Sequence, residues 1–475
     1  MKNIRFYTTM ILMAAGLVFV ASKTNAQKIN SLYFLENTPI NARMNPAMSP
    51  KYSGFGIGLS SFSYYLQSDL ALDDIYYPQS NGELYSFMHP DVDKNVFLSK
   101  LNDVSSFSFG TNLELFSLGI RINKKSYLSV HTGINFDLGL GVPKDFFRFF
   151  LLGMDENTEV STFDMKSLKL EAMLYSKTGG SFSTQVNDKI KIGIGLNYLQ
   201  GYMNASMGFD EFKIDASETK WDVSSQGYLQ IAAPEELQLA YSEDGYLNNI
   251  ENTYEMNSSG DYSATFNSMA KVGSGFSIDL GVTVKPLDYL TISASLTDIG
   301  SINWNEEYIQ KATSNGSFSY EGSELDEITG NKDNSGSSNN QLGEKLQDFI
   351  RFEKATDVES YKTRLTTKLN LAAELGILEN NITFGVLSQT GIAKNGKYSD
   401  LMVSANLKPG SLVQTAFTYS LLHGEASSFG AAVNIKLLLF NFFLAADYIP
   451  LSYTPQNLPV SNSFYNMQCG LNFMF

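Results

Sequence analysis

The chain has 475 residues, of which 17% are charged, below the roughly 25% of an average globular protein. The formal net charge of −15 argues against a protein that binds nucleic acid through a basic surface. The single cysteine excludes an internal disulfide and a cysteine-rich metal site. Low charge combined with 13% aromatic residues is typical of strands that have one lipid-facing side and one polar side.

Residues 1–26 have the organisation of a secretory signal peptide. Lys2 and Arg5 form a basic start, residues 7–21 form an apolar run, and the small residue Ala26 precedes the expected cleavage site. The alternative is a membrane anchor, but the run is shorter than the roughly 20 residues that a spanning helix needs. We expect cleavage after residue 26 and export of the remainder.

Residues 27–53 precede the first predicted strand and contain three prolines and apolar residues without a clear period. The alternating pattern that begins after this segment predicts an outer-membrane β-barrel over residues 54–475. Residues 27–53 either fold into that predicted barrel as a plug on the periplasmic side or simply fix this end of the chain.

The barrel prediction rests on alternation with a period of two residues. In 189–199, Ile190, Ile192 and Ile194 alternate with polar residues or glycines, which indicates a strand and not a helix. The same pattern predicts about 14 strands (range 12–16), at 54–66, 104–122, 126–138, 166–186, 189–207, 271–284, 288–299, 361–377, 382–391, 398–407, 411–421, 427–437, 441–449 and 464–475. An additional hairpin at 208–222 or 303–320 is left open.

A soluble β-sandwich would also alternate, but two features favour a transmembrane antiparallel barrel. The predicted strands are longer than the roughly 5 to 6 residues of globular sheets. Short turns also alternate with long connections, as periplasmic turns and extracellular loops do in outer-membrane barrels. The long connections are expected at 67–103, 139–165, 208–270 and 300–360, with short loop helices at 143–153 and 342–355.

The last predicted strand places Phe473 and Phe475 in its apolar register. A strand that closes a barrel must pair on both sides, because an open edge in lipid leaves backbone groups unsatisfied. An aromatic residue at that position suits the lipid interface. It also resembles the C-terminal signal that the barrel-assembly machinery reads in outer-membrane proteins.

Two stretches resemble an uncharacterised family of outer-membrane β-barrels from Bacteroidota. The first is "ARMNPAMSP" (42–50), which contains Asn45 and Pro46, and the second is "GSGFSIDLGVTVKP" followed by "LTISASLTDIGSINW". The family signature falls here on Asp279, Gly281, Asp298, Gly300 and Trp304. More remotely, such barrels resemble the long-chain fatty-acid transporter class and barrels associated with type IX secretion. The resemblance implies a fold and a Gram-negative outer membrane, but no established activity.

No constellation of residues indicates catalysis, so we expect no catalytic residues, no cofactor and no metal site. His131 is expected to face the lumen, where a phospholipase-like pairing with a serine stays open. Asp279 and Asp298 lie on neighbouring predicted strands, with Lys285 between them. They form either a lumenal charge network or a device that holds strand register, and the second interpretation is favoured.

Two functions follow from these observations. The first is a transport barrel for apolar or amphipathic solutes, whose lumen is partly filled by residues 27–53. The second is a non-enzymatic surface scaffold or secretion-associated barrel that binds a partner protein through its long loops. Membrane lipid and the barrel-assembly machinery are expected partners in both.

Overall fold

The computed structural model describes residues 31–475 apart from 37, 51–53, 155–157, 253–271, 322–350, 394–395, 411, 423–425, 448–452 and 457–463. The predicted signal peptide, residues 1–26, and the start of the 27–53 segment lie outside the described residues.

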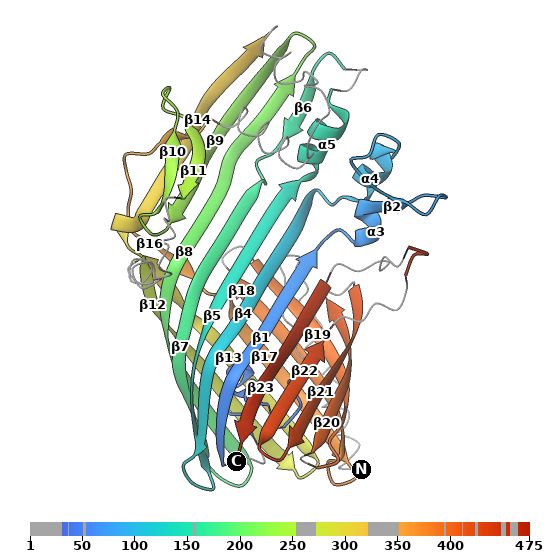
Figure 1. Ribbon diagram of the computed structural model, residues 1–475, viewed down its shortest axis with the longest axis vertical. Coiled ribbons are helices and arrows are strands. Elements are labelled where there is room, and N and C mark those ends of the chain that lie inside the picture. The colour runs from blue at the N-terminus through green and yellow to red at the C-terminus, as the bar shows by residue number, and fades with distance from the viewer. Residues whose placement is uncertain are drawn as a thin grey trace, which may run out of the picture.

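Fourteen antiparallel strands form one closed barrel, which confirms the predicted fold class (Figure 1). The sheet closes because β1 pairs with β4 on one side and with β23 on the other. The wall consists of β1 (Phe55–Ser68), β4 (Val104–Arg121), β5 (Ser126–Pro143), β7 (Lys169–Gln185), β8 (Ile190–Ala216), β12 (Gly273–Leu287), β13 (Leu290–Trp304), β17 (Thr367–Ile377), β18 (Ile382–Ala393), β19 (Gly396–Leu407), β20 (Val413–Leu422), β21 (Ala426–Leu437), β22 (Phe440–Ala446) and β23 (Phe464–Met474). Each corresponds to one predicted strand.

Short turns gather at one end of the barrel, beside the C-terminal residue (Figure 1). The turn between β17 and β18 has positive φ angles at Leu378, Glu379 and Asn380, and the turn between β21 and β22 has one at Leu438. Left-handed backbone of this kind lets a strand reverse within a few residues. The predicted alternation of short turns with long connections is therefore confirmed.

A sheet extends one side of the barrel beyond the wall. The upper part of β8 pairs with β6 (Ser161–Asp164) and β9 (Lys220–Ala232), and β9 pairs with β14 (Ile309–Glu321), which pairs with β15 (Glu353–Lys354). The segments 208–270 and 300–360 are therefore partly strand and not only loop. The additional strands that 208–222 and 303–320 suggested exist, but they lie above the wall and leave its strand number at fourteen.

The helices are short and belong to the long connections. The predicted helix at 143–153 is α5 (Lys144–Leu152), whose Phe146 and Phe149 are buried against the extension sheet. The predicted helix at 342–355 is wrong at its described end, where β15 forms, and residues 342–350 lie outside the described residues. The 67–103 connection folds into α3 (Leu72–Ile75), α4 (Lys94–Lys100) and the hairpin of β2 (Tyr76–Pro78) and β3 (Leu84–Ser86).

The remaining elements are small. They are α2 (Asn41–Met44), the hairpin of β10 (Leu237–Tyr241) and β11 (Leu247–Asn252), η1 (Glu306–Tyr308), and β16 (Tyr361–Arg364), which pairs with the upper part of β13. No helix among the described residues is long and apolar enough to cross a membrane.

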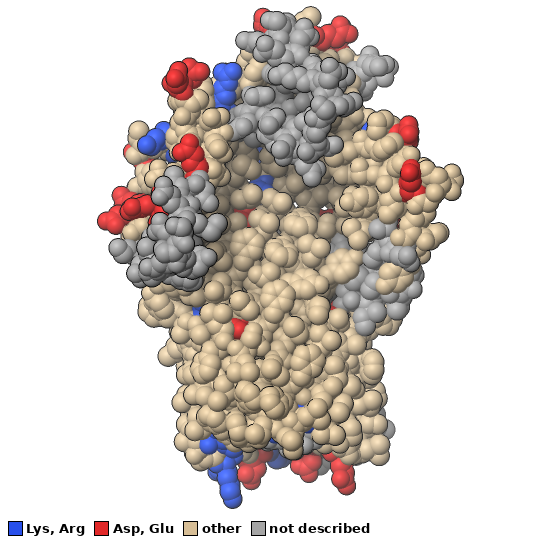
Figure 2. Space-filling model, in the orientation of Figure 1, with Lys and Arg blue, Asp and Glu red and all other residues tan. Residues whose placement is uncertain are grey.

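The lower part of the barrel presents an apolar band to its surroundings. Figure 2 shows a broad zone with almost no charged side chains between a charged lower rim and a charged upper region. Outward side chains such as Leu115, Leu196 and Phe417 are exposed there. An apolar surface of this extent around a closed barrel is that of a membrane-spanning protein.

Candidate functional site

The inner face of the wall is made mainly of small and polar residues. On β5 the inward register includes Ser129, His131 and Gly133, and on β8 it includes Gly193 and Asn197. Barrels with a permanently packed interior fill it with side chains from their own strands. This wall instead leaves space that another part of the chain occupies.

Residues 31–50, which we call the inner segment, occupy that space in the lower part of the barrel. One side of the segment is apolar and packs against the strands from β17 to β23. Phe34 contacts the cluster of Leu387 and Met402, and Leu35 lies in a cluster with Ala416 and Phe443. Ser31 adds a polar anchor, since its backbone N–H donates to Asp447 Oδ1 at 2.7 Å.

The other side of the inner segment is polar and meets strands β4, β8, β12 and β13. Arg43 on α2 forms an ion pair with Glu114 of β4, a wall carboxylate that is only 4% exposed. Asn45 Nδ2 donates to the carbonyl oxygens of Val282, at 3.5 Å, and Ala294, at 3.4 Å. Met44 O accepts from Ser295 Oγ at 2.6 Å. Polar contacts of this kind fix the segment by direction as well as by burial.

Two glycines in the wall make the close approach of the segment possible. A Cβ atom at Gly193 would overlap the carbonyl group of Pro46, and one at Gly281 would overlap the side chain of Asn45. The family resemblance at Asn45, Pro46 and Gly281 therefore marks one contact between segment and wall. Any larger residue at either glycine would displace the segment.

Above this contact, four charged side chains from four strands form a network on the inner face. Lys177 Nζ of β7 lies 2.6 Å from Asp298 Oδ1 of β13 and 3.5 Å from Asp279 Oδ2 of β12. Lys368 Nζ of β17 lies 3.1 Å from Asp298 Oδ2. Asn197 on β8 joins the network through a 2.9 Å hydrogen bond to Asp279. The network has no excess charge, as buried ionic groups require.

Asp298 has a backbone conformation that is unusual within a strand. Its φ is +60°, and the pairing of β12 with β13 shifts register between Ile278 and Leu280 at this point. The Asp298 backbone N–H donates to Asp279 Oδ1 at 2.7 Å. A β-bulge of this kind redirects a side chain, and here it directs the Asp298 carboxylate to two lysines.

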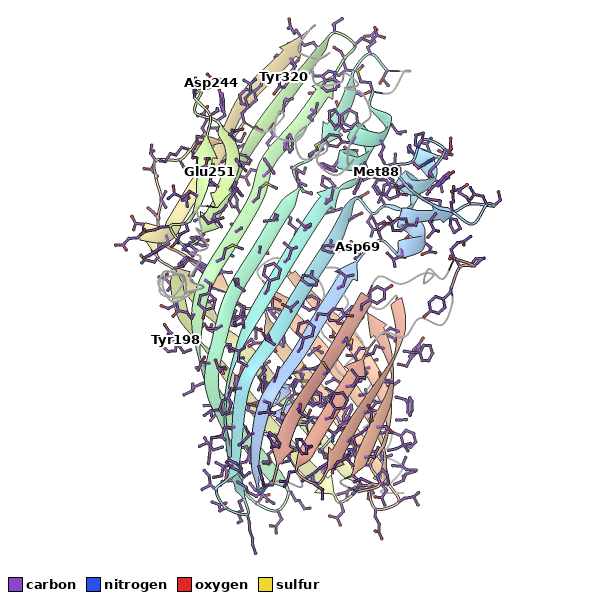
Figure 3. All side chains as sticks on the ribbon, viewed as in Figure 1. Asp69, Met88, Tyr198, Asp244, Glu251 and Tyr320 are labelled. Atoms are coloured by element: carbon purple, nitrogen blue, oxygen red, sulfur yellow. The ribbon has the colours of Figure 1, made fainter. Side chains whose placement is uncertain are left out.

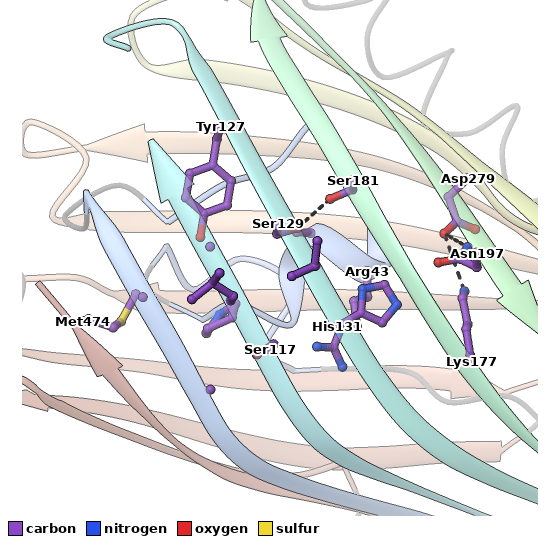
Figure 4. Close-up of a pocket in the computed structure, with 17 residues that line it drawn as sticks. Arg43, Ser117, Tyr127, Ser129, His131, Lys177, Ser181, Asn197, Asp279 and Met474 are labelled. Atoms are coloured by element: carbon purple, nitrogen blue, oxygen red, sulfur yellow. Dashed lines mark hydrogen bonds and ion pairs between the residues drawn. The ribbon is translucent and has the colours of Figure 1, made fainter. Parts of the chain in front are cut away.

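A small cavity of about 30 Å³ lies between the inner segment and the wall. Its lining includes Arg43, His131, Lys177, Asn197 and Asp279 (Figure 4). His131 Nε2 and Asn197 Oδ1 have no hydrogen-bond partner among the described residues. A cavity of this size holds about two water molecules, which need 2–4 polar partners each.

The structure brings most of the predicted residues together. Asn45, Pro46 and Gly281 meet where the inner segment contacts the wall. His131, Asp279 and Asp298 lie in the charged network above that contact or in the cavity beside it. The predicted cation Lys285 is not among the partners of the two aspartates, which pair with Lys177 and Lys368 instead.

The other predicted residues lie apart from the charged network. Gly300 packs against the backbone of β12, and Trp304 is buried higher on the inner face, where Nε1 donates to Thr363 Oγ1 at 2.9 Å. Phe473 contacts Phe440 with ring centroids 4.9 Å apart, and Phe475 lies beside Phe55 at the short-turn end. These two phenylalanines are far from the lumenal network.

Sequence reasoning missed Arg43, Glu114, Lys177 and Lys368. A signal for two of them existed, because Glu114 and Lys177 each lie within a predicted strand, six residues or more from the next charged residue in the chain. An isolated inward charge in a barrel strand requires a partner. The sequence alone does not show which opposite charge supplies it.

Residues 46–447 match the profile of the "Family of unknown function (DUF5723)". The chain belongs to this family. A search among curated proteins found no match.

Among solved structures, the chain is similar to the toluene transporter TbuX of Ralstonia pickettii, with 9% identity, 96% of each chain covered and a TM-score of 0.39. It is also similar to a FadL homologue of Pseudomonas aeruginosa, with 10% identity, 95% of this chain and 99% of that chain covered, and a TM-score of 0.39. A third is the translocator domain of the autotransporter NalP from Neisseria meningitidis, with 6% identity, 94% and 100% coverage and a TM-score of 0.32.

Proposed function

We propose that this protein is an outer-membrane transport barrel for apolar or amphipathic solutes, and that the inner segment is its gate. One observation carries the proposal. The wall lines its lumen with small and polar residues, and a separate stretch of the same chain packs inside its lower part. An interior built in this way becomes a passage when the segment leaves.

The inner face favours an amphipathic solute over a purely apolar one. Tyr175, Leu199 and Trp304 form an apolar cluster on the inner face of the extended side. The charged network that contains Lys177 and Asp298 lies below this cluster along the same strands. Leu199 and Trp304 are fully buried in that cluster, so the charged network is the part of this face that a solute can meet. A solute with a polar group would match it better than a purely apolar one.

The proposal also includes the export and assembly of the protein. Residues 1–26 are removed on export to the outer membrane of a Gram-negative bacterium, and residues 27–53 serve as a plug on the periplasmic side. The barrel-assembly machinery reads Phe473 and Phe475. The protein has no enzymatic activity in this scheme.

A disulfide between segment and wall tests the gate. Ser31 Oγ and Thr418 Oγ1 are 2.8 Å apart, close enough for two cysteines to form a bond. In a Cys469→Ala background, S31C/T418C should block dodecanoate uptake by liposomes when oxidised and restore it when reduced. The matched control is S129C/S181C, whose oxygens are also 2.8 Å apart but join two wall strands.

The outcomes are distinct. Uptake that stops only with the segment disulfide supports the gate. Equal uptake in the oxidised and reduced S31C/T418C protein means that the segment is not the gate. Uptake no faster than in empty liposomes for the Cys469→Ala protein overturns the transport function.

A second candidate function is a surface scaffold, and the extension sheet favours it. Strands β6, β9 and β14 rise with β8 beyond the wall and share a hydrophobic cluster that contains Phe163, Phe212 and Val223. Transport alone does not need this structure. Native mass spectrometry of protein gently extracted from its own membrane tests the idea, because a scaffold should retain a stoichiometric protein partner.

A further inference from the structure

The outer face of β8, β12 and β13 changes from apolar to polar over a few residues. Leu196 of β8 pairs with Ile278 of β12, and both side chains are exposed. Two residues higher, Tyr198 pairs with Phe276, and two residues higher again, Gln200 pairs with Ser274. Ser274 pairs in turn with Asn303 of β13. This order of side chains is the one expected across a lipid–water boundary.

The aromatic pair marks the boundary itself. The rings of Tyr198 and Phe276 are 5.4 Å apart at 62°, and the side chains are 43% and 70% exposed. Tyr198 donates its hydroxyl hydrogen upward, to Gln200 Oε1 at 3.0 Å. Figure 3 places Tyr198 on the outside of the wall, so the pair faces lipid. Aromatic rings with a polar tip on one side concentrate at this level of a membrane protein.

A hollow of about 480 Å³ begins at Tyr198 and continues on the polar side of the boundary. Its volume lies within the roughly 300–1,000 Å³ of ligand pockets. The described residues that line it are Tyr198, Gly273, Ser274, Asn303, Asn305, Glu306 and Ser360. Gly273 is buried and its carbonyl oxygen accepts a hydrogen bond from Gln200 Nε2 at 2.7 Å. The other lining residues contribute hydroxyl, amide and carboxylate groups.

The lining selects for an uncharged polar ligand. None of the described lining residues is a lysine or an arginine, whereas Glu306 places a carboxylate in the lining. Lys362 lies opposite Asn303 on β16 but is not among the lining residues. A phosphate group in the hollow would therefore meet an anion and no lining cation. Serine, tyrosine and asparagine side chains both donate and accept hydrogen bonds. A group rich in hydroxyls, which also donates and accepts, matches them, and the exposed Phe276 ring offers an apolar face beside it.

We propose that this hollow binds the headgroup of a membrane lipid that is uncharged and rich in hydroxyls, such as a glycosyl lipid. Its acyl chains lie against Leu196 and Ile278, and its headgroup meets Asn303 and Ser274. This inference requires that the barrel spans a membrane, but it does not depend on the gate.

Lipid retention tests the site. The full chain is placed in phosphatidylcholine nanodiscs that contain equal amounts of a glucosyl diacylglycerol and a phosphatidylglycerol with identical acyl chains. After purification into detergent, native mass spectrometry counts the lipid that each molecule retains. We expect the glucosyl lipid to exceed the phosphatidylglycerol about fivefold, which corresponds to one net hydrogen bond.

Two variants and a control locate the site. N303A and F276A should each lower the ratio of retained glucosyl lipid to retained phosphatidylglycerol to about one. F429A is the matched control, because Phe429 pairs with Tyr419 in an outward aromatic pair on β20 and β21, with centroids 4.9 Å apart. It should leave the excess unchanged, and the gel mobility of the folded barrel shows that all three variants fold.

Equal retention of both lipids, or preference for phosphatidylglycerol, overturns the proposal. A loss of the excess in F429A as large as in F276A also overturns it, because binding would then be general to the lipid belt. The same preparations can be assayed for dodecanoate uptake, so a failure of this site is distinguished from a failure of transport.

Discussion

The two sides of the barrel differ in height and in chemistry. On the tall side, which runs from β4 to β13, strands β4, β5, β7 and β8 have 18, 18, 17 and 27 residues (Figure 1). On the short side, which runs from β17 to β23, strands β20, β21, β22 and β23 have 10, 12, 7 and 11. A tilted transmembrane strand needs about 9–11 residues. The short side therefore does little more than span the membrane, and the tall side carries the surface structure.

The same division continues inside the lumen. The inner segment contacts the tall side through the Arg43–Glu114 ion pair and the amide of Asn45. It contacts the short side through Phe34 and Leu35 in apolar clusters. One side thus holds the segment by electrostatic and directional contacts, and the other holds it mainly by burial. Weakening either kind of contact should therefore weaken the docking of the segment.

The largest effect on docking of the segment should come from Arg43→Met on the polar side. Glu114 would stay buried without a partner, which costs about 3 kcal/mol or more. Hydrogen exchange in residues 31–50 should then accelerate roughly a hundredfold. The double variant R43M/E114M removes both charges and should recover most of the protection. If R43M alone exchanges as the parent does, the ion pair does not hold the segment.

Phe34→Ala tests the apolar side. Removing a buried phenylalanine side chain costs about 3 kcal/mol, and Phe34 is buried in a cluster that includes Leu387 and Met402. Exchange in the segment should accelerate by a similar or slightly smaller factor. Phe62→Ala is the control, because Phe62 is exposed on the outer face. Equal effects of the two variants would mean that the apolar contact is not specific.

A smaller effect is expected from Gly193→Ala. The added methyl group would overlap Pro46, and overpacking of this kind costs about 1–3 kcal/mol. Hydrogen exchange in the segment again provides the measurement. Gly139→Ala is the matched control, since the nearest atom to its Cβ would be the Glu171 carbonyl oxygen at 4.0 Å. Unchanged protection in G193A would show that the segment does not need this close approach.

The sequence predicted the barrel well because every wall strand keeps its own alternating pattern. The strand predicted at 189–207 is recognisable without knowledge of its neighbours, and only its upper end differs from the prediction. β8 continues to Ala216 and then pairs with β9 above the wall. Alternation persists beyond the membrane, so it does not show where a strand leaves the wall.

The lumenal site was predictable only in part, for a different reason. Asp279 and Asp298 were found through a short signature, but Lys177 lies 121 residues from Asp298 in the chain and joins it only through the barrel. The positive φ of Asp298 depends on how β12 and β13 pair at the bulge. Pairings between distant strands, and not local patterns, determine both features.

The smallest predicted effect concerns the network that holds this bulge. Lys368 is about one-third exposed, and among the described residues its ammonium group pairs with Asp298, which keeps Lys177 as a second partner. Because a partly exposed ion pair contributes about 1 kcal/mol or less, Lys368→Met should barely change the urea concentration at which the barrel unfolds, as measured by gel mobility. Lys177→Met is the comparison, and it should lower that concentration clearly, because it leaves both aspartates on the inner face without their shared lysine. Equal effects would mean that Lys368 stabilises the bulge as much as Lys177 does. The polar contacts that stabilise the tall side would then include β17, the first strand of the short side.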